Sequence, residues 1–140
     1  MKKIFITIIV MFIVASNVNS APTFCLLDWF EGDYYAYTQT KTDPQSTNLG
    51  FCYMTNKQVS KNQILGESMV IKNFEPSSAL NKLEAEVVKT EYLENGTIVI
   101  YAYTKKINKT VSMFDKQVNL QIAYKEESSV IGWPLIYGSF

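Results

Sequence analysis

Residues 87–104, VVKTEYLENGTIVIYAYT, decide the fold class of this chain. Segments 87–93 and 97–104 are rich in β-branched and aromatic residues, and Asn95-Gly96 between them is typical of a two-residue hairpin loop. With that loop, Leu93 faces Ile98 in the expected register. The hairpin then presents one apolar and aromatic face suited to packing, formed by Val88, Tyr92, Val99, Tyr101 and Tyr103.

The sequence after this hairpin continues an antiparallel pattern. Residues 110–114 predict a third strand, and Asp115-Lys116 predicts a tight turn. Residues 118–124 predict a fourth strand, in which apolar side chains alternate with polar ones such as Asn119. Residues 130–137 predict a last strand, and Pro134 within it requires an edge strand or a bulge, because proline has no amide hydrogen to donate.

The sequence before the hairpin contains one clear helix and a less regular part. Glu75-Pro76 predicts a helix start, followed by one apolar stripe as far as about Ala85. Within residues 21–74, the patterns predict strands at 23–30, 34–40, 51–55 and 68–74, a loop at 41–48 and a short helix at 58–65. Together with residues 75–140 they predict a single α+β domain over residues 21–140, an antiparallel meander of about five strands packed by one or two helices.

The first twenty residues predict an export signal. Lys2 and Lys3 precede twelve uncharged, mostly apolar residues, which span only about 18 Å as a helix, short of the roughly 30 Å of a bilayer core. A cut after Ser20 would leave residues 21–140 as the mature, extracytoplasmic protein. An uncleaved segment that tethers the chain to a membrane is the alternative.

Composition excludes several kinds of chemistry. All 13 basic residues are Lys, and the chain has no His and no Arg, which removes His-based catalysis, His-ligated metals and Arg clamps. Without Lys2 and Lys3 the net charge is 11 − 13 = −2, the wrong sign for a nucleic-acid binder. The sequence predicts no catalytic residue, cofactor or metal, so we expect a protein that is not an enzyme.

Two cysteines are present, Cys25 and Cys52, and in an oxidising compartment they predict one disulfide. A reactive thiol is the alternative. It would require a neighbouring cation, a histidine or a Cys-x-x-Cys spacing, and none of these is visible in the sequence.

Aromatic and acidic residues provide the remaining candidates for a site. Aromatic residues suggest a partly exposed binding surface, for instance for envelope sugars: Trp29, Tyr34, Tyr35, Tyr37, Tyr101 and Tyr103. For those between Trp29 and Tyr37, packing in the core is the simpler interpretation. Asp28, Glu31 and Asp33 are close in sequence but match no calcium-binding loop, and a solvated turn explains them better. A carboxylate pair for glycoside hydrolysis stays open, but no pair among Glu84, Glu86, Glu91 and Glu94 is singled out.

Four runs of the C-terminal half carry a family resemblance: 83–88 LEAEVV, 101–104 YAYT, 116–123 KQVNLQIA and 131–136 IGWPLI. In this order they resemble the YwmB proteins of spore-forming Gram-positive bacteria, which are described as TATA-box-binding-protein-like. The resemblance covers about residues 80–140. It implies an exported, non-enzymatic protein with a helix-backed sheet, and it does not imply DNA binding.

The sequence therefore predicts an exported binding or structural protein of the cell envelope, associated with sporulation or the wall. Its candidate partners are a cell-wall polymer or an envelope protein. A small secreted hydrolase that uses paired carboxylates is one alternative. A homodimeric interaction domain, joined through an edge strand near Pro134 or the Tyr101/Tyr103 face, is the other.

Overall fold

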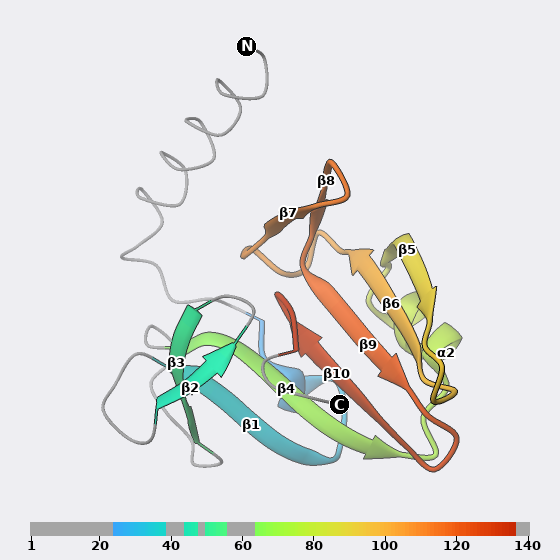
Figure 1. Ribbon diagram of the computed structural model, residues 1–140, viewed down its shortest axis with the longest axis horizontal. Helices are drawn as coiled ribbons and strands as arrows, with labels where there is room; N and C mark the ends of the chain where they lie inside the picture. The colour runs from blue at the N-terminus through green and yellow to red at the C-terminus, as the bar shows by residue number, and fades with distance from the viewer. Residues whose placement is uncertain (1–23, 39–43, 48–49, 56–63, 137–140) are drawn as a thin grey trace.

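The computed structural model describes residues 24–38, 44–47, 50–55 and 64–136 (Figure 1). Its main feature is an eight-stranded antiparallel sheet with the order β2-β3-β1-β4-β10-β9-β6-β5. These strands are β1 (Asp33–Thr38), β2 (Pro44–Thr47), β3 (Gly50–Thr55), β4 (Ile64–Lys72), β5 (Glu86–Tyr92), β6 (Ile98–Tyr103), β9 (Leu120–Tyr124) and β10 (Ser128–Trp133).

Two helices and a small hairpin complete the described part of the chain. They are the 3-10 helix η1 (Leu26–Asp28), the α-helix α2 (Pro76–Lys82) and a separate hairpin of β7 (Val111–Met113) and β8 (Lys116–Val118). The α+β class is therefore confirmed. The sheet has more strands than the five or so expected, because β1 to β4 join the C-terminal strands through the pairing of β4 with β10.

The N-terminal part differs from the expected strands and helices in two places. Residues 23–30 were expected to form a strand, but η1 forms instead, closed by hydrogen bonds from the Trp29 and Phe30 amides to the Leu26 carbonyl. The helix expected at 58–65 falls largely on residues outside the described part, and its last two residues begin β4. The expected export segment, residues 1–20, also lies outside it. No helix in the described part is long and apolar enough to cross a bilayer.

The helix α2 ends earlier than residue 85, the expected end of its apolar stripe. Glu84 adopts a left-handed conformation (φ 51°), its amide bonds to the Asn81 carbonyl, and the Ala85 amide bonds to the Leu80 carbonyl at 2.8 Å. These two hydrogen bonds form a Schellman motif, which usually has glycine at the left-handed position. Because Glu84 occupies that position here, the sequence gives no glycine signal for the stop.

The β5–β6 hairpin forms where it was expected, but its register is shifted by one residue. Tyr92, not Leu93, faces Ile98, and β5 has a bulge between Val87 and Lys89. The loop is a three-residue type with Gly96 left-handed (φ 86°), closed by a hydrogen bond from the Leu93 amide to the Thr97 carbonyl. The expected packing face is therefore wrong, because Tyr92 lies on the opposite face of the hairpin from Val99, Tyr101 and Tyr103.

Two expectations for the C-terminal strands are also wrong. Residues 110–114 do form a strand, β7, and a tight turn follows at Phe114 and Asp115 (φ 54° and 60°), one residue earlier than expected, but β7 is not part of the main sheet: among the described strands it pairs with β8, and β6 pairs directly with β9. The last strand is not an edge strand, because β10 lies between β4 and β9. It ends at Trp133, so Pro134 lies just beyond it and no amide hydrogen is missing from the ladder.

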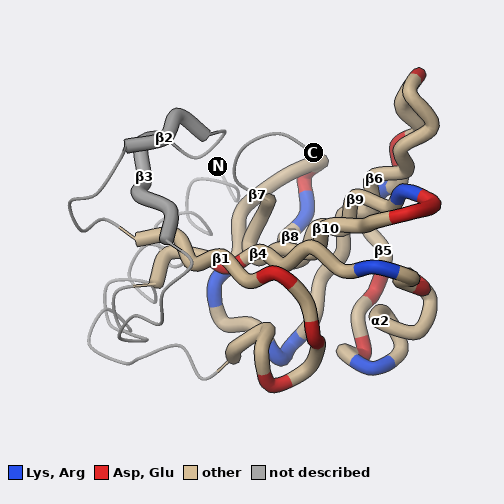
Figure 2. Tube along the Cα trace, turned by 90° about the horizontal axis from the view of Figure 1, so that it is seen from below, with Lys and Arg blue, Asp and Glu red and all other residues tan. Residues whose placement is uncertain are grey.

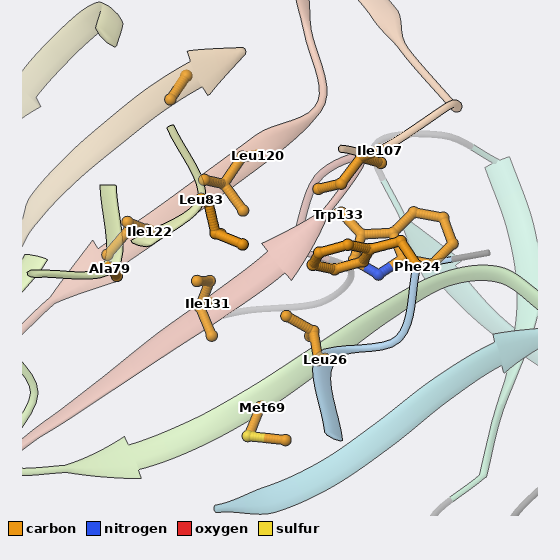
Figure 3. Close-up of a cluster of buried hydrophobic side chains, with 11 residues drawn as sticks. Phe24, Leu26, Met69, Ala79, Leu83, Ile107, Leu120, Ile122, Ile131 and Trp133 are labelled. Carbon is orange, nitrogen blue, oxygen red and sulfur yellow. The ribbon is translucent and has the colours of Figure 1, made fainter. Parts of the chain in front are cut away.

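The hydrophobic core lies between one face of the sheet and the two helices, η1 and α2. Figure 3 shows Met69 of β4, Ile131 and Trp133 of β10 and Leu120 and Ile122 of β9 directed toward Phe24, Leu26 and the helix residues Ala79 and Leu83. On the opposite face the C-terminal segment packs on β9 and β10. There the Ile136 amide donates to Gln121 Oε1 at 2.7 Å, and a Cβ on Gly132 would lie 3.0 Å from the Ile136 side chain.

Asn119, expected on the polar side of a strand, is fully buried between β8 and β9. Its Oδ1 accepts from the Thr104 amide, and its Nδ2 donates to the carbonyl oxygens of Thr104 (2.7 Å) and Ile107 (2.8 Å). The Asn119 side chain thus provides hydrogen-bond partners for backbone groups of Thr104 and Ile107, which follow the end of β6 and have no strand partner there among the described residues.

Candidate functional site

A buried carboxyl group fixes the N-terminal segment to the sheet. Glu67, in the middle of β4, is 0% exposed. Its Oε1 accepts hydrogen bonds from the Leu26 amide (3.0 Å) and from Trp133 Nε1 (2.6 Å). Its Oε2 accepts from the Tyr34 hydroxyl and from the Cys25 thiol (3.3 Å). Four donors from three segments therefore converge on one carboxyl group, as expected for a buried group of this kind.

Two of these donors have altered acid–base properties. Burial, followed by the neighbouring Glu67 carboxyl group, raises the pKa of the Cys25 thiol above its ordinary value of 9.0. Burial and the hydrogen bond to Glu67 raise the pKa of the Tyr34 hydroxyl above 10.0. A raised pKa keeps the thiol protonated at neutral pH, which disfavours a nucleophilic role for Cys25.

The Glu67 contacts position the two aromatic residues that follow η1. The Trp29 ring stacks on Phe24 at 6.0 Å between ring centroids, and Phe24 contacts the Trp133 ring edge to face. Phe30 packs edge to face on Phe74. Both Trp29 and Phe30 remain half-buried, so each ring is supported by the core and also reaches the surface.

Two lysines lie over these rings. Lys82, at the end of α2, donates to the Trp29 carbonyl oxygen at 2.6 Å, and its ammonium lies 5.3 Å from the centre of the Phe30 ring. The Lys106 ammonium lies 5.2 Å from the centre of the Trp29 ring. Both distances are within the range of a cation–π contact. We name Trp29, Phe30, Lys82 and Lys106 the aromatic–lysine patch.

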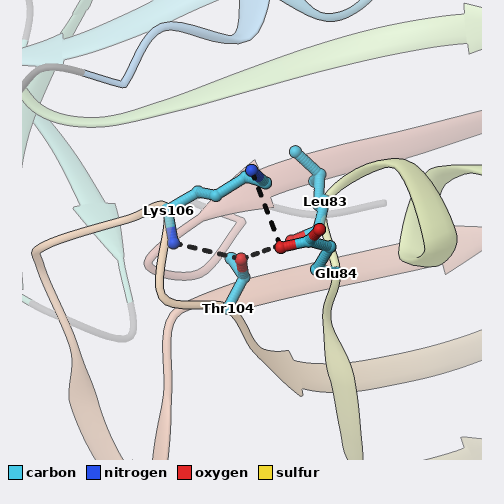
Figure 4. Close-up of polar contacts among 4 residues, drawn as sticks. All are labelled: Leu83, Glu84, Thr104 and Lys106. Carbon is cyan, nitrogen blue, oxygen red and sulfur yellow. Dashed lines mark hydrogen bonds and ion pairs between the residues drawn. The ribbon is translucent and has the colours of Figure 1, made fainter.

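Lys106 is held in place by the end of α2. Figure 4 shows the Thr104 hydroxyl between the two segments: it donates to the Leu83 carbonyl oxygen at 2.6 Å and accepts from the Lys106 amide at 3.2 Å. The Lys106 ammonium also lies 3.8 Å from Glu84 Oε2. Because Glu84 is mostly exposed, this ion pair is screened by water and contributes little to stability.

The aromatic residues expected to form a binding surface are not brought together. Trp29 belongs to the patch, whereas Tyr34 points to Glu67 and the buried Tyr37 shares a hydrogen bond with Ser68 Oγ on the other face of the sheet. Tyr35 follows Tyr34 directly in β1 and is half-buried. Tyr101 and Tyr103 lie far along the sheet on β6, where the Tyr101 ring contacts Phe114 at 5.1 Å between centroids.

Cys25 carries a free thiol, which donates to Glu67. The side chain of Cys52 lies outside the described residues, so the disulfide between Cys25 and Cys52 stays a prediction.

The acidic residues in the described part of the chain do not form a candidate metal site. In the described segments, no group of three or more His, Cys, Asp or Glu side chains is close enough to hold a metal ion. Asp28, Glu31 and Asp33 are each exposed around the turn before β1. Among the four acids considered for hydrolysis, Glu84, Glu86 and Glu94 are exposed, and Glu91 lies beside Tyr101 on the sheet.

Three residues of the site, Glu67, Lys82 and Lys106, were not predicted from the sequence. Glu67 could have been suspected, because it alternates with Leu65, Met69 and Ile71 and so lies on the apolar face of its strand. The two lysines gave no signal, because each is far in sequence from the ring it covers: Lys82 is 82 − 30 = 52 positions from Phe30, and Lys106 is 106 − 29 = 77 positions from Trp29.

No protein-family model matches this chain, and comparison with curated proteins and with solved structures also found no match.

Proposed function

We propose that this protein is an exported, non-enzymatic binding protein of the cell envelope, and that it binds an anionic wall polymer through the aromatic–lysine patch. The observation that carries the proposal is the placement of two ammonium groups over two half-buried rings. The ammonium groups attract phosphate or carboxylate groups of such a polymer, and the exposed parts of the two rings offer apolar contact to its sugars.

The N-terminal sequence supports the compartment. Lys2 and Lys3 followed by a short apolar run are typical of a signal peptide, and its removal would place the patch outside the cytosol. The resemblance of residues 80–140 to the YwmB proteins supports an envelope role connected with sporulation or the wall, and a TATA-binding-protein-like arrangement of the sheet and helices.

The charge distribution also favours a polymer with few charges per site over a nucleic acid. Lysines and acids are interspersed along the described chain, as Figure 2 shows, and the mature chain has the net charge of −2 derived above. A nucleic-acid site would require a continuous basic surface. Two lysines beside aromatic rings fit a sugar polymer with isolated anionic groups better.

Co-sedimentation with purified cell wall tests the proposal. We expect the protein to pellet with the wall, and to pellet less as salt is added, because the ammonium contacts are screened. An unrelated acidic protein of similar size and net charge is the control. Retention no greater than that of the control would contradict the proposed function, and so would turnover of the wall material by the protein.

A further inference from the structure

Among the described residues, the strand β5 forms one end of the main sheet and is paired only on its β6 side (Figure 1). Three of the large apolar side chains that the described residues expose lie on this strand or directly after it: Val87, Leu93 and Tyr92, of which Tyr92 is 77% exposed. An edge strand with exposed apolar residues is a template for pairing with another strand.

The hairpin fixes which backbone groups of β5 face outward. The Leu93 amide bonds to Thr97, so this pair is hydrogen-bonded. Hydrogen-bonded and non-hydrogen-bonded pairs alternate along an antiparallel ladder. Glu91 and Lys89, which face Val99 and Tyr101, therefore bond to β6, whereas the amide and carbonyl groups of Thr90 and Tyr92 point away from the sheet.

The charges of β5 are complementary to those of a second, antiparallel β5. If Thr90 lies on a two-fold axis, Lys89 of each copy faces Glu91 of the other, and the outward groups of the two Thr90 residues meet as a hydrogen-bonded pair. A register centred on Lys89 would instead place two lysines opposite each other. It would also bring together residues whose backbone groups are already used by β6.

The side chains of Lys89 and Glu91 lie on the same face, as these ion pairs require. The Lys89 ammonium lies 4.7 Å from the centre of the Phe114 ring, and Glu91 accepts a hydrogen bond from Tyr101, which itself contacts Phe114. The two new ion pairs would form beside this cluster.

We propose that the protein forms a symmetric dimer by antiparallel pairing of β5 with β5 of a second copy, centred on Thr90, so that the two main sheets become one. The bulge between Val87 and Lys89 ends the regular ladder and keeps the paired segment short. The dimer is therefore weak, and its population depends on protein concentration. This surface is distinct from the aromatic–lysine patch and does not depend on the proposed function.

Sedimentation velocity at a series of protein concentrations tests the proposal. The protein is used as it is isolated from the expressing cells, with no residues removed by design. We expect the wild type to shift from monomer to dimer as the concentration rises. Thr90→Pro should remain monomeric with an unchanged circular dichroism spectrum, because the outward Thr90 amide has no bond to β6 to lose. A monomeric wild type at all concentrations, or a folded Thr90→Pro variant that dimerises normally, would overturn the proposal.

Charge variants provide an independent test that does not rely on proline. Lys89→Glu and Glu91→Lys, each alone, should weaken dimerisation at least about tenfold, because like charges then face each other. An equimolar mixture of the two should restore the dimer, because every cross-strand pair is again opposite in charge. Lys116→Glu, which makes the same charge change on β8, should dimerise as the wild type does. Failure of the mixture to recover would overturn the assigned register.

Discussion

Replacing Glu67 tests how η1 and the aromatic–lysine patch are held on the sheet. Glu67→Leu removes both acceptor oxygens and leaves the Leu26 amide, Trp133 Nε1, the Tyr34 hydroxyl and the Cys25 thiol without their partner. Glu67→Gln keeps one acceptor oxygen, and the hydroxyl and thiol can rotate to accept from the new amide. We therefore expect the free energy of unfolding to decrease in the order wild type, Glu67→Gln, Glu67→Leu.

The magnitude follows from the number of donors. A buried hydrogen bond contributes about 1 kcal/mol, so the loss of four gives about 4 kcal/mol for Glu67→Leu, against a total stability of about 5–15 kcal/mol. Glu67→Gln should cost about 1–2 kcal/mol. With a urea dependence of about 1.5 kcal/mol per M, the Glu67→Leu midpoint should fall by about 2.7 M.

Urea denaturation followed by tryptophan fluorescence measures these changes, and hydrogen exchange at the Leu26 amide reports directly on the attachment of η1. Glu84→Gln, at a mostly exposed position, is the matched control and should leave the midpoint unchanged. If Glu67→Leu is as stable as the wild type and the Leu26 amide stays protected, the reasoning is refuted.

Two further predictions concern the buried polar groups. Asn119→Ala should lower the free energy of unfolding by about 3 kcal/mol in urea denaturation, because three buried backbone groups lose their partners; Asn108→Ala, at an exposed position, should have little effect, and equal stability of the two variants would contradict the role given to Asn119. The pKa values of the Cys25 thiol and the Tyr34 hydroxyl are raised in the folded state, so above about pH 9 these groups ionise first in the unfolded chain, and the free energy of unfolding should fall as the pH rises. This alkaline loss, measured by urea denaturation over a pH series, should be smaller in Cys25→Ser, and an identical pH profile for the two proteins would rule out the thiol as a contributor.

The sheet-rich fold class could be predicted because it depends on local patterns. Two-residue alternation and the Asn95-Gly96 dipeptide located β5, β6 and the turn between them. The register could not be predicted from the same residues, because Asn-Gly is compatible with both a two-residue and a three-residue loop, and only the left-handed Gly96 with the Leu93–Thr97 bond selects the latter. A shift of one residue then placed Tyr92 on the wrong face.

The strand order and the site depend on contacts between distant residues, which periodicity does not report. Pro134 suggested an edge strand, but the strand ends one residue before it and lies inside the sheet. Among the aromatic candidates Trp29 was identified from composition, while the lysine that covers its ring comes from the segment after β6. Tyr34 and Tyr37 lie three residues apart in β1 and so point to opposite faces of the sheet, but periodicity does not report their partners, Glu67 and Ser68.

The affinity of lysine variants for purified cell wall tests the central claim most directly. Lys82→Gln with Lys106→Gln removes the two ammonium groups of the patch, whereas Lys72→Gln with Lys125→Gln removes two exposed ammonium groups elsewhere. Both pairs change the net charge equally, so any difference between them reports on position. We predict that the patch variant binds at least about tenfold more weakly and the control within about twofold of the wild type. Equal affinity of the two double variants would contradict the account.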